Sequence, residues 1–210
     1  RKEGDWWLLF DTRTGRKVTL SFLDSPRPRP LASVPELVDL KITDYCAYGC
    51  TYCYQKSTAR GKHCENLAGW YRALADAEVF EVAIGGGEPT EHPEFKRLLE
   101  DCGGGDTVIN FTTRNMDWLA ANADLVRTKC GGFAVSVDDC EAAEGVLNRL
   151  DECELLENAT LQYVMGVADD DNFVRLVKLA YDLGARMTLL GYKTTGRGRS
   201  ARRHLPQTPL

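Results

Sequence analysis

The sequence lacks any long hydrophobic run. No apolar stretch approaches the roughly 20 residues that a membrane-spanning helix needs, and residues Arg1–Asp5 lack the apolar character of a secretory signal. Hydrophobic residues make up 43% and charged residues 27% of the 210-residue chain, ordinary values for a globular protein with one buried core. We therefore expect a soluble, cytoplasmic protein with no membrane partner.

Acidic residues are missing from the C-terminal segment. From Lys193 to Leu210 there are five Lys or Arg residues and no Asp or Glu. Since the whole chain carries a net charge of −5, residues 1–192 carry −10. A basic tail can hold nucleic acid or an anionic substrate, although such a segment is more often a solvated surface. The acidic remainder argues against a nucleic-acid partner.

The eight cysteines include no second closely spaced group. Cys46, Cys50 and Cys53 lie within eight residues. The other five show no CxxC spacing: Cys64, Cys102, Cys130, Cys140 and Cys153. Scattered free cysteines are mostly small buried hydrophobes, although Cys140, just past a predicted strand, could be catalytic. The cluster of three indicates a metal centre, and iron-bound thiolates need a reducing compartment.

Residues 1–33 predict a small N-terminal β-hairpin followed by a linker. Residues 6–10 and 17–22 are strand-like runs on either side of a polar turn that contains glycine. The alternating prolines of residues 25–30 cannot continue a sheet and predict a stiff, extended linker. We place the main domain at residues 34–193 and a basic C-terminal tail at residues 194–210.

Strands and helices alternate through the main domain. Short apolar runs predict six buried strands, at Leu37–Thr43, Val79–Ile84, Thr107–Thr113, Gly132–Val137, Thr160–Val164 and Arg186–Leu190. Two of the intervening segments show clear helical faces: Leu67, Trp70, Tyr71 and Leu74, then Phe173, Leu176, Val177, Ala180 and Tyr181. The pattern predicts an α/β fold, a partial (β/α)6 barrel of parallel strands with right-handed crossovers.

The barrel is expected to lack its final helix. The tail is rich in Arg, Gly and Pro and carries no helix signal after the sixth strand. We expect that the parent chain continues further, or that a loop or a partner closes the barrel.

The cysteine cluster directly follows the first predicted strand of the barrel. In β/α barrels the chemistry lies in the loops after the C-terminal ends of the strands. Three thiolates can hold three irons of a cubane and leave the fourth iron open, whereas an electron-carrying cluster normally has four cysteine ligands. A zinc knuckle with His63 or Cys64 as fourth ligand is the alternative, but zinc sites more often show paired CxxC units.

Residues 46–53, CAYGCTYC, resemble the cluster motif of the radical S-adenosylmethionine (SAM) superfamily. Gly85-Gly86-Gly87-Glu88-Pro89, at the end of the second strand, is similar to the Gly-Gly-Glu-Pro motif of that family. The resemblance spans residues 37–192 and implies a [4Fe–4S] cluster on Cys46, Cys50 and Cys53. It also implies a contact of Tyr52 near the adenine of SAM.

Physical chemistry agrees with the family role of the second motif. Glu88 can accept a hydrogen bond from the amino group of SAM, and Gly86 and Gly87 let the backbone approach closely because no Cβ intervenes. The alternative is a glycine-rich turn in which Glu88 merely lies near a helix start.

Later strands offer further contacts to SAM that the resemblance implies. They are Thr113, Ser136, Gln162 and Tyr192, at or near the ends of the third to sixth strands. The family often has Thr-Asn-Gly after the third strand, and Thr113-Arg114-Asn115 departs from it. Asn115 and Asp138 are alternatively helix caps. Gln162 alternatively points between helices, and Lys193 is either a contact to an anion or a solvated lysine.

The resemblance implies a radical enzyme. The reduced cluster cleaves SAM to methionine and a 5′-deoxyadenosyl radical, which takes a hydrogen atom from the substrate. A one-electron reductant such as ferredoxin or flavodoxin would be a partner. We expect a peptide or small natural-product substrate, because the hairpin edge could add a peptide strand. The alternatives are modification of nucleic acid and a non-enzymatic Fe–S or zinc-binding module.

Overall fold

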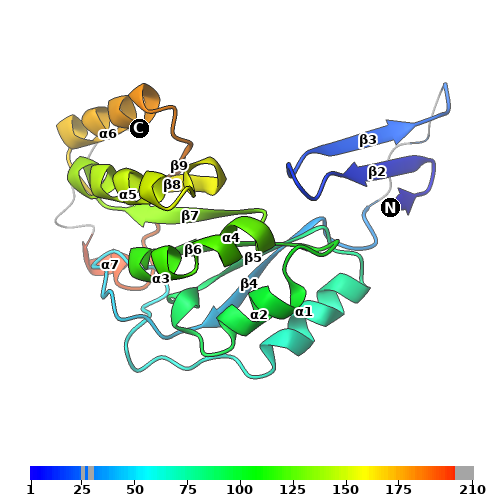
Figure 1. Ribbon diagram of the computed structural model, residues 1–210, viewed down its shortest axis with the longest axis horizontal. Coiled ribbons are helices and arrows are strands. Elements are labelled where there is room, and N and C mark those ends of the chain that lie inside the picture. Colours follow the sequence, from blue (N-terminus) through cyan, green and yellow to red (C-terminus); the bar gives the residue numbers. More distant parts are fainter. Residues whose placement is uncertain (25–26, 28–30, 202–210) are drawn as a thin grey trace.

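The computed structural model describes residues 1–24, 27 and 31–201, which form two β-sheets (Figure 1). The larger sheet has six strands whose spatial order equals their order in the sequence. They are β4 (Leu37–Thr43), β5 (Glu81–Gly86), β6 (Val108–Thr113), β7 (Gly132–Val137), β8 (Ala159–Val164) and β9 (Met187–Leu190). Neighbouring strands are parallel throughout, so the six predicted strands are confirmed.

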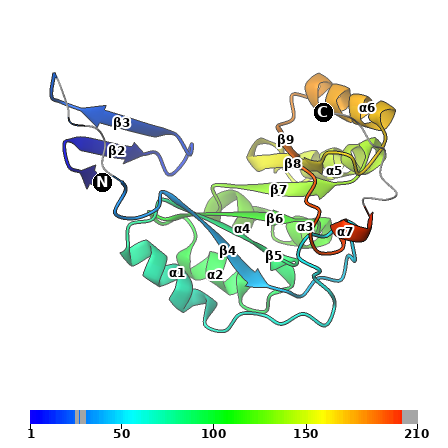
Figure 2. The ribbon, with the colours of Figure 1, turned by 180° about the vertical axis from the view of Figure 1, so that it is seen from behind.

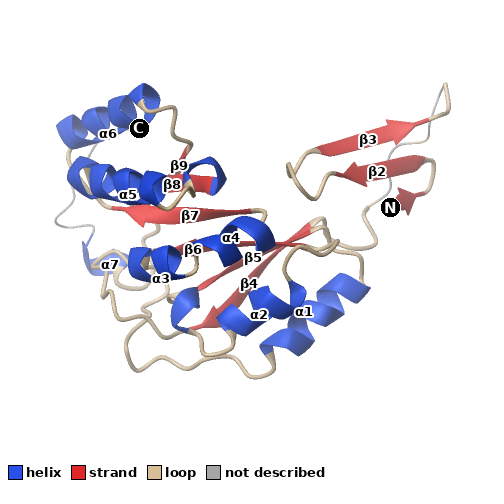
Figure 3. Cartoon of the chain, in the orientation of Figure 1, coloured by secondary structure: helices blue, strands red, loops and turns tan. Residues whose placement is uncertain are grey.

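Helices connect successive strands and lie on one face of this sheet (Figures 1 and 3). They are α1 (Leu67–Asp76), η1 (Pro89–Glu91), α2 (Phe95–Cys102), α3 (Met116–Ala121), α4 (Ala123–Lys129), α5 (Cys140–Glu152), η2 (Leu156–Asn158) and α6 (Asp170–Asp182). Right-handed crossovers that always advance to the next strand place every connection on the same side. Figure 2 shows the sheet from the opposite side.

The sheet is a partial (β/α)6 barrel, as the sequence predicts. β4 and β9 are its two edges, and in the described part of the chain each pairs with one neighbour. The expectation of no helix after β9 is wrong, because a short helix, α7 (Gly198–Ala201), forms there. A single turn spans too few residues to produce the hydrophobic periodicity by which helices are recognised.

Burial alternates along the strands. Val82, Ile84, Ile109, Phe111, Phe133 and Val135 are buried in one hydrophobic cluster together with residues of the crossover helices. The residues between them face the barrel interior and are half-buried, among them Asn110, Thr112, Ser136 and Gln162. The predicted strands are therefore buried and apolar on the helix side of the sheet, whereas the inner side is polar and half-buried.

In α1 and α6, the apolar face predicted from the sequence is wider than the face that is buried in the structure. In α1, Leu67 and Tyr71 are buried, but Trp70 is 58% exposed. In α6, Leu176 and Ala180 are buried, but Tyr181 is 84% exposed. A crossover helix packs on the sheet along a narrow stripe, so apolar residues at the borders of the pattern reach solvent.

None of the helices formed by residues 1–24, 27 and 31–201 has both the length and the apolar character to span a membrane.

The smaller sheet is antiparallel, with strands β1 (Lys2–Glu3), β2 (Trp6–Phe10) and β3 (Lys17–Ser21). β2 and β3 form the predicted hairpin. β1 was not predicted, because two residues are too few to show the alternation of apolar and polar side chains that identifies a strand. The sheet contacts the amino end of the barrel strands: Phe10 stacks on Phe80 at 5.2 Å between ring centroids, and Lys17 pairs with Glu81 at 2.5 Å. The predicted proline linker lies largely outside the described residues.

Candidate cofactor site

A loop after β4 carries the three clustered cysteines. Cys46 donates its backbone N–H to Thr58 at 3.0 Å, and Cys53 donates to the Cys50 carbonyl at 3.2 Å, so the loop folds back on itself. All three cysteines are half-buried. Burial raises the pKa of the Cys46 thiol, and the neighbouring Glu88 and Cys50 raise it further. The two backbone hydrogen bonds keep the three cysteines in one compact loop.

The glycines at the end of β5 have different environments. A Cβ on Gly86, whose φ is +124°, would lie 2.4 Å from the Thr43 carbonyl oxygen, and one on Gly87 would lie 1.9 Å from the Tyr45 oxygen. These two glycines therefore let β5 pack against the β4 backbone, whereas the sequence predicts close approach to SAM at these positions. A Cβ on Gly85 would meet nothing within 4 Å, so open space adjoins this residue.

Glu88 is a buried carboxylate at the mouth of the barrel, only 2% exposed. Its Oε1 accepts from the Thr113 hydroxyl at 2.5 Å and from the Thr90 hydroxyl at 2.7 Å, and from the Thr90 N–H at 3.3 Å. Its Oε2 accepts from the Arg114 backbone N–H at 3.0 Å, which is the one hydrogen bond to this oxygen within the described residues. Burial raises the pKa of Glu88, although these hydrogen bonds oppose the shift. One acceptor position therefore remains on Oε2 for a further donor.

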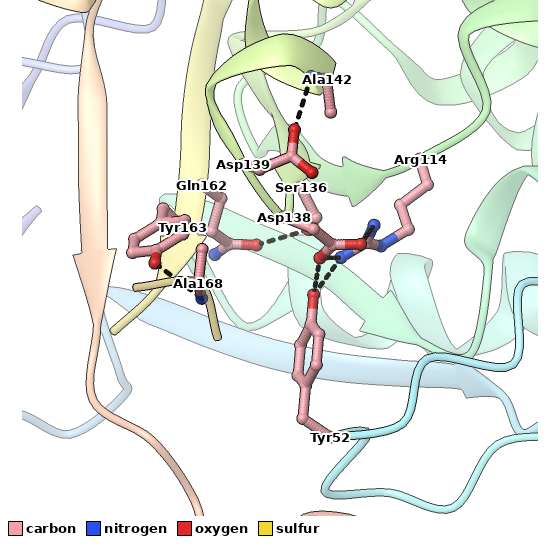
Figure 4. Close-up of polar contacts among 9 residues, drawn as sticks. All are labelled: Tyr52, Arg114, Ser136, Asp138, Asp139, Ala142, Gln162, Tyr163 and Ala168. Carbon is pink, nitrogen blue, oxygen red and sulfur yellow. Dashed lines mark hydrogen bonds and ion pairs between the residues drawn. The ribbon is translucent and has the colours of Figure 1, made fainter. Parts of the chain in front are cut away.

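Tyr52, Arg114 and Asp138 converge from three segments (Figure 4). Arg114 donates to both carboxylate oxygens of Asp138, and also to the Tyr52 hydroxyl, which itself donates to Asp138. Burial alone would raise the pKa of Asp138, but Arg114 and Tyr52 lower it below its usual value. Burial raises the pKa of Tyr52, which stays a hydrogen-bond donor. The triad ties the cysteine loop to the ends of β6 and β7.

Ser136 and Gln162 are brought together on the inner face of the barrel. They are direct neighbours on β7 and β8, and the Ser136 hydroxyl donates to Gln162 Oε1 at 3.2 Å (Figure 4). The alternative that Gln162 points between helices is wrong, because its partner lies on the inner face. Both side chains are half-buried and share the mouth with the triad.

Asn115 and Asp138 are the two site candidates that could alternatively cap a helix, and only one of them does so. Asn115 is the N-cap of α3, and its side chain accepts from the Trp118 N–H at 3.1 Å. Asp138 is not a cap, because Asp139 caps α5 by accepting from the Ala142 N–H at 2.7 Å (Figure 4). Asp138 is thereby free to bind Arg114.

Tyr192 and Lys193 follow β9, and both contact nearby protein groups. The Tyr192 hydroxyl donates to the Gly198 carbonyl at 2.8 Å. The Lys193 ammonium lies 4.1 Å from the centroid of the Tyr54 ring, a cation–π contact with the cysteine loop. Lys193 is therefore neither purely solvated nor paired with an acid in the described residues.

The residues proposed for a zinc knuckle have other partners. His63 Nδ1 lies 2.9 Å from the Thr43 hydroxyl, and Cys64 lies 3.7 Å from His92 Nε2. Among the described residues, no group of three or more His, Cys, Asp or Glu side chains surrounds a single-ion site. The scattered cysteines pack with the hydrophobic clusters, Cys140 with one and Cys64, Cys102, Cys130 and Cys153 with the other.

Sequence reasoning missed Arg114 and Arg197. The only signal for Arg114 was the departure from Thr-Asn-Gly, which gave no reason to expect an ion pair with Asp138. Arg197 was counted as part of a basic tail, yet it contacts the cysteine loop through several hydrogen bonds. Contacts between residues about 150 positions apart leave no local pattern.

The structure is an open parallel α/β barrel whose loop after the first strand carries three half-buried free cysteines. The family profile of the radical SAM superfamily matches residues 40–194. The chain therefore belongs to the radical SAM superfamily.

The solved structures with a similar fold include SuiB of Streptococcus suis bound to the precursor peptide SuiA. The TM-score is 0.60 at 18% identity, over 77% of this chain and 40% of that chain. For SuiB bound to S-adenosylmethionine the TM-score is 0.59 at 19% identity, over 77% and 41%. This chain thus spans about two fifths of the SuiB chain. A search among curated protein sequences returned no match.

Membership of this family implies a [4Fe–4S] cluster and SAM as cofactors. The site has donors suited to both. Cys46, Cys50 and Cys53 supply the soft thiolate ligands that iron–sulfur clusters use. Glu88 keeps an acceptor position on Oε2 for an ammonium group, and no side chain of the described residues fills the space beside Gly85.

Proposed function

We propose that this protein is a radical SAM enzyme that reductively cleaves SAM and abstracts hydrogen from a peptide or small natural product. The supporting observation is that the cysteine loop follows β4 and Glu88 follows the neighbouring strand β5, where its N–H donates to the carbonyl of Tyr45, the residue before Cys46, at 2.8 Å. Cluster and SAM together supply a 5′-deoxyadenosyl radical when bound. A one-electron reductant such as ferredoxin or flavodoxin is the expected partner.

The residues of the chain bind and orient in this proposal. Cys46, Cys50 and Cys53 hold the cluster, and Glu88 accepts from the SAM ammonium, which a charge-assisted hydrogen bond favours. Ser136 and Gln162 offer a hydroxyl and an amide for the polar part of SAM or of the substrate. These groups stand on the inner face, where neighbouring side chains are half-buried and polar.

Tyr52 contributes to SAM binding mainly through its backbone in this proposal. Its hydroxyl is engaged by Arg114 and Asp138, which fixes the side chain. Thr113 acts through Glu88, because its hydroxyl donates to that carboxylate. Gly86, Gly87 and Tyr192 support the shape of the site, since each is held against protein backbone.

A peptide substrate is favoured by the N-terminal sheet. In β2 and β3, Trp7 pairs with Leu20 and Leu9 with Val18, so four apolar side chains share one face. Each is 37–49% exposed, and β3 is one of the two edge strands of its sheet among the described residues. An extended peptide can add to such an edge through backbone hydrogen bonds and place alternate side chains on the apolar face.

The position of the N-terminal sheet sets a minimum length for a peptide substrate that docks on it. It contacts Phe80 and Glu81 at the amino end of β5, whereas the cysteine loop lies beyond the carboxyl ends of the strands. A six-residue strand spans about 20 Å. A peptide docked on β3 must therefore continue for at least about six extended residues before it reaches the mouth.

Deuterium transfer tests both the chemistry and the substrate class. The reconstituted protein, SAM and dithionite would be incubated with a small-peptide fraction from cells grown in deuterated water, and in parallel with RNA fragments from the same cells. We expect 5′-deoxyadenosine to form and to gain deuterium from the peptides. No 5′-deoxyadenosine would refute the enzyme, and deuterium from RNA alone would reverse the choice of substrate. Cys50→Ala protein is the matched control and should give no product.

A further inference from the structure

The cysteine loop is held by a residue from the far end of the described chain. Arg197 Nε donates to the Cys50 carbonyl at 2.8 Å, and Nη1 donates to the Ser57 carbonyl at 2.7 Å. The backbone N–H of Arg197 donates to the Cys53 carbonyl at 2.9 Å. One residue thus contacts two of the three cysteines that carry the thiols and the end of their loop.

Glycines on either side of Arg197 make this approach possible. Gly196 has a φ of +61°, and a Cβ there would lie 2.2 Å from the Tyr54 carbonyl oxygen. A Cβ on Gly198 would lie 2.4 Å from the Lys193 oxygen. A larger residue at position 196 would push residues 192–198, here called the clasp, away from the cysteine loop, and one at position 198 would disturb the backbone packing within the clasp.

Two further contacts seat the clasp. The Tyr192 hydroxyl donates to the Gly198 carbonyl at 2.8 Å, which closes the clasp on itself. The Lys193 ammonium lies over the Tyr54 ring at 4.1 Å from its centroid. The clasp therefore contacts the loop through hydrogen bonds, a ring face and close backbone packing.

The charge of Arg197 is directed toward the loop. Its side chain binds carbonyl oxygens, and within the described residues no carboxylate forms an ion pair with it. A guanidinium remains protonated in proteins, and a half-buried charge is screened less than an exposed one. Its positive charge therefore lies beside the backbone of Cys50, one of the three expected cluster ligands.

We propose that Arg197 is a positioning residue for the cluster. It orders the cysteine loop before metal arrives, and its charge favours the reduced, more negative state of the cluster. The loop carbonyls would otherwise need water or mobile contacts, because buried backbone acceptors require donors. The electrostatic part rests on the proposed function, whereas the ordering of the loop concerns the protein without metal.

The first measurement uses metal-free protein, so it does not depend on activity. Hydrogen exchange of the amides in residues 44–58 would be compared among the wild type, Arg197→Gln, Arg197→Lys and Arg175→Gln. Arg175 lies on the exposed side of α6 and serves as the matched control. Loss of two charge-assisted hydrogen bonds should speed exchange in this loop about tenfold or more in Arg197→Gln. Unchanged exchange would overturn the ordering role.

The second measurement uses reconstituted protein and an EPR-monitored redox titration. Arg197→Gln should lower the midpoint potential of the cluster, and Arg197→Lys should restore most of that shift while its loop still exchanges faster than the wild type. Arg175→Gln should match the wild type in both measurements. Equal potentials in the Gln and Lys variants would overturn the role of the charge. If the wild type binds no cluster, the proposed function fails, while the exchange result still decides the ordering role.

Discussion

Arg114 and Asp138 form a bidentate ion pair at the mouth of the barrel, between the ends of the neighbouring strands β6 and β7. Nη1 donates to Oδ2 at 2.9 Å and Nη2 to Oδ1 at 2.7 Å. The side chains are 19% and 41% exposed, so solvent screens the pair only in part. The Arg114 backbone N–H also supports Glu88, at 3.0 Å. One residue therefore joins the ion pair to the buried carboxylate.

Arg114→Lys should lower the free energy of unfolding by about 1 kcal/mol, because an ammonium cannot bind both carboxylate oxygens in the planar fork. Urea unfolding of the metal-free protein measures this. Adding Asp138→Asn to the lysine variant should cost less than adding it to the wild type. Arg149→Lys, which alters the more exposed pair with Asp117, is the control and should change stability little. Equal losses at Arg114 and Arg149 would contradict the prediction.

Glu88→Gln should weaken SAM binding about tenfold or more, because a hydrogen bond to a charged group is worth roughly 1.5–3 kcal/mol. The cluster should remain, since Glu88 is not one of its expected ligands. Equilibrium binding of SAM to the reconstituted protein measures the effect, with iron analysis on the same samples. Glu100→Gln, on the exposed side of α2, is the matched control.

Ser136→Ala should weaken SAM binding less than Glu88→Gln does, because it removes a neutral hydroxyl rather than a charge. An unchanged dissociation constant in Glu88→Gln would show that the carboxylate only organises Thr90, Thr113 and the Arg114 backbone.

The described chain should bind a single cluster. Reconstituted protein should contain about four irons, and the triple replacement of Cys46, Cys50 and Cys53 by Ala should contain close to none. The other five cysteines pack with two hydrophobic clusters instead of one another. Cys140→Ala should keep the full iron content. About eight irons in the wild type, or about four in the triple variant, would reveal a second site.

His92 should make stability depend on pH. It is 3% exposed, and its burial lowers the pKa of the ring below the usual value of about 6.5. The folded state therefore binds protons less readily than the unfolded state, so stability present above pH 6.5 is lost as the pH falls toward the lowered pKa.

Chemical denaturation of the metal-free protein at a series of pH values tests this effect. The wild type should lose more free energy of unfolding than His92→Gln does as the pH falls below about 6.5. Parallel curves for the two proteins would show that His92 does not contribute.

The sequence by itself determined the order of strands, the parallel sheet and the family. Buried strands and crossover helices carry local hydrophobic periodicities, and clustered cysteines carry their chemistry in their spacing. Leu37–Thr43 and Gly132–Val137 were predicted to the residue. The N-cap Asn115 also follows from local rules, because a cap and its helix are adjacent in the chain.

Only the tertiary structure decided which side chains meet. Arg114 and Asp138 are 24 residues apart, and Arg197 and Cys50 are 147 residues apart. Such pairs form because parallel strands end at a common edge, which collects groups from distant segments irrespective of their separation in sequence. The same reason explains why Gly86 and Gly87 proved to be packing positions against β4: the carbonyl oxygens that exclude a Cβ belong to Thr43 and Tyr45, which only the folded sheet brings beside them.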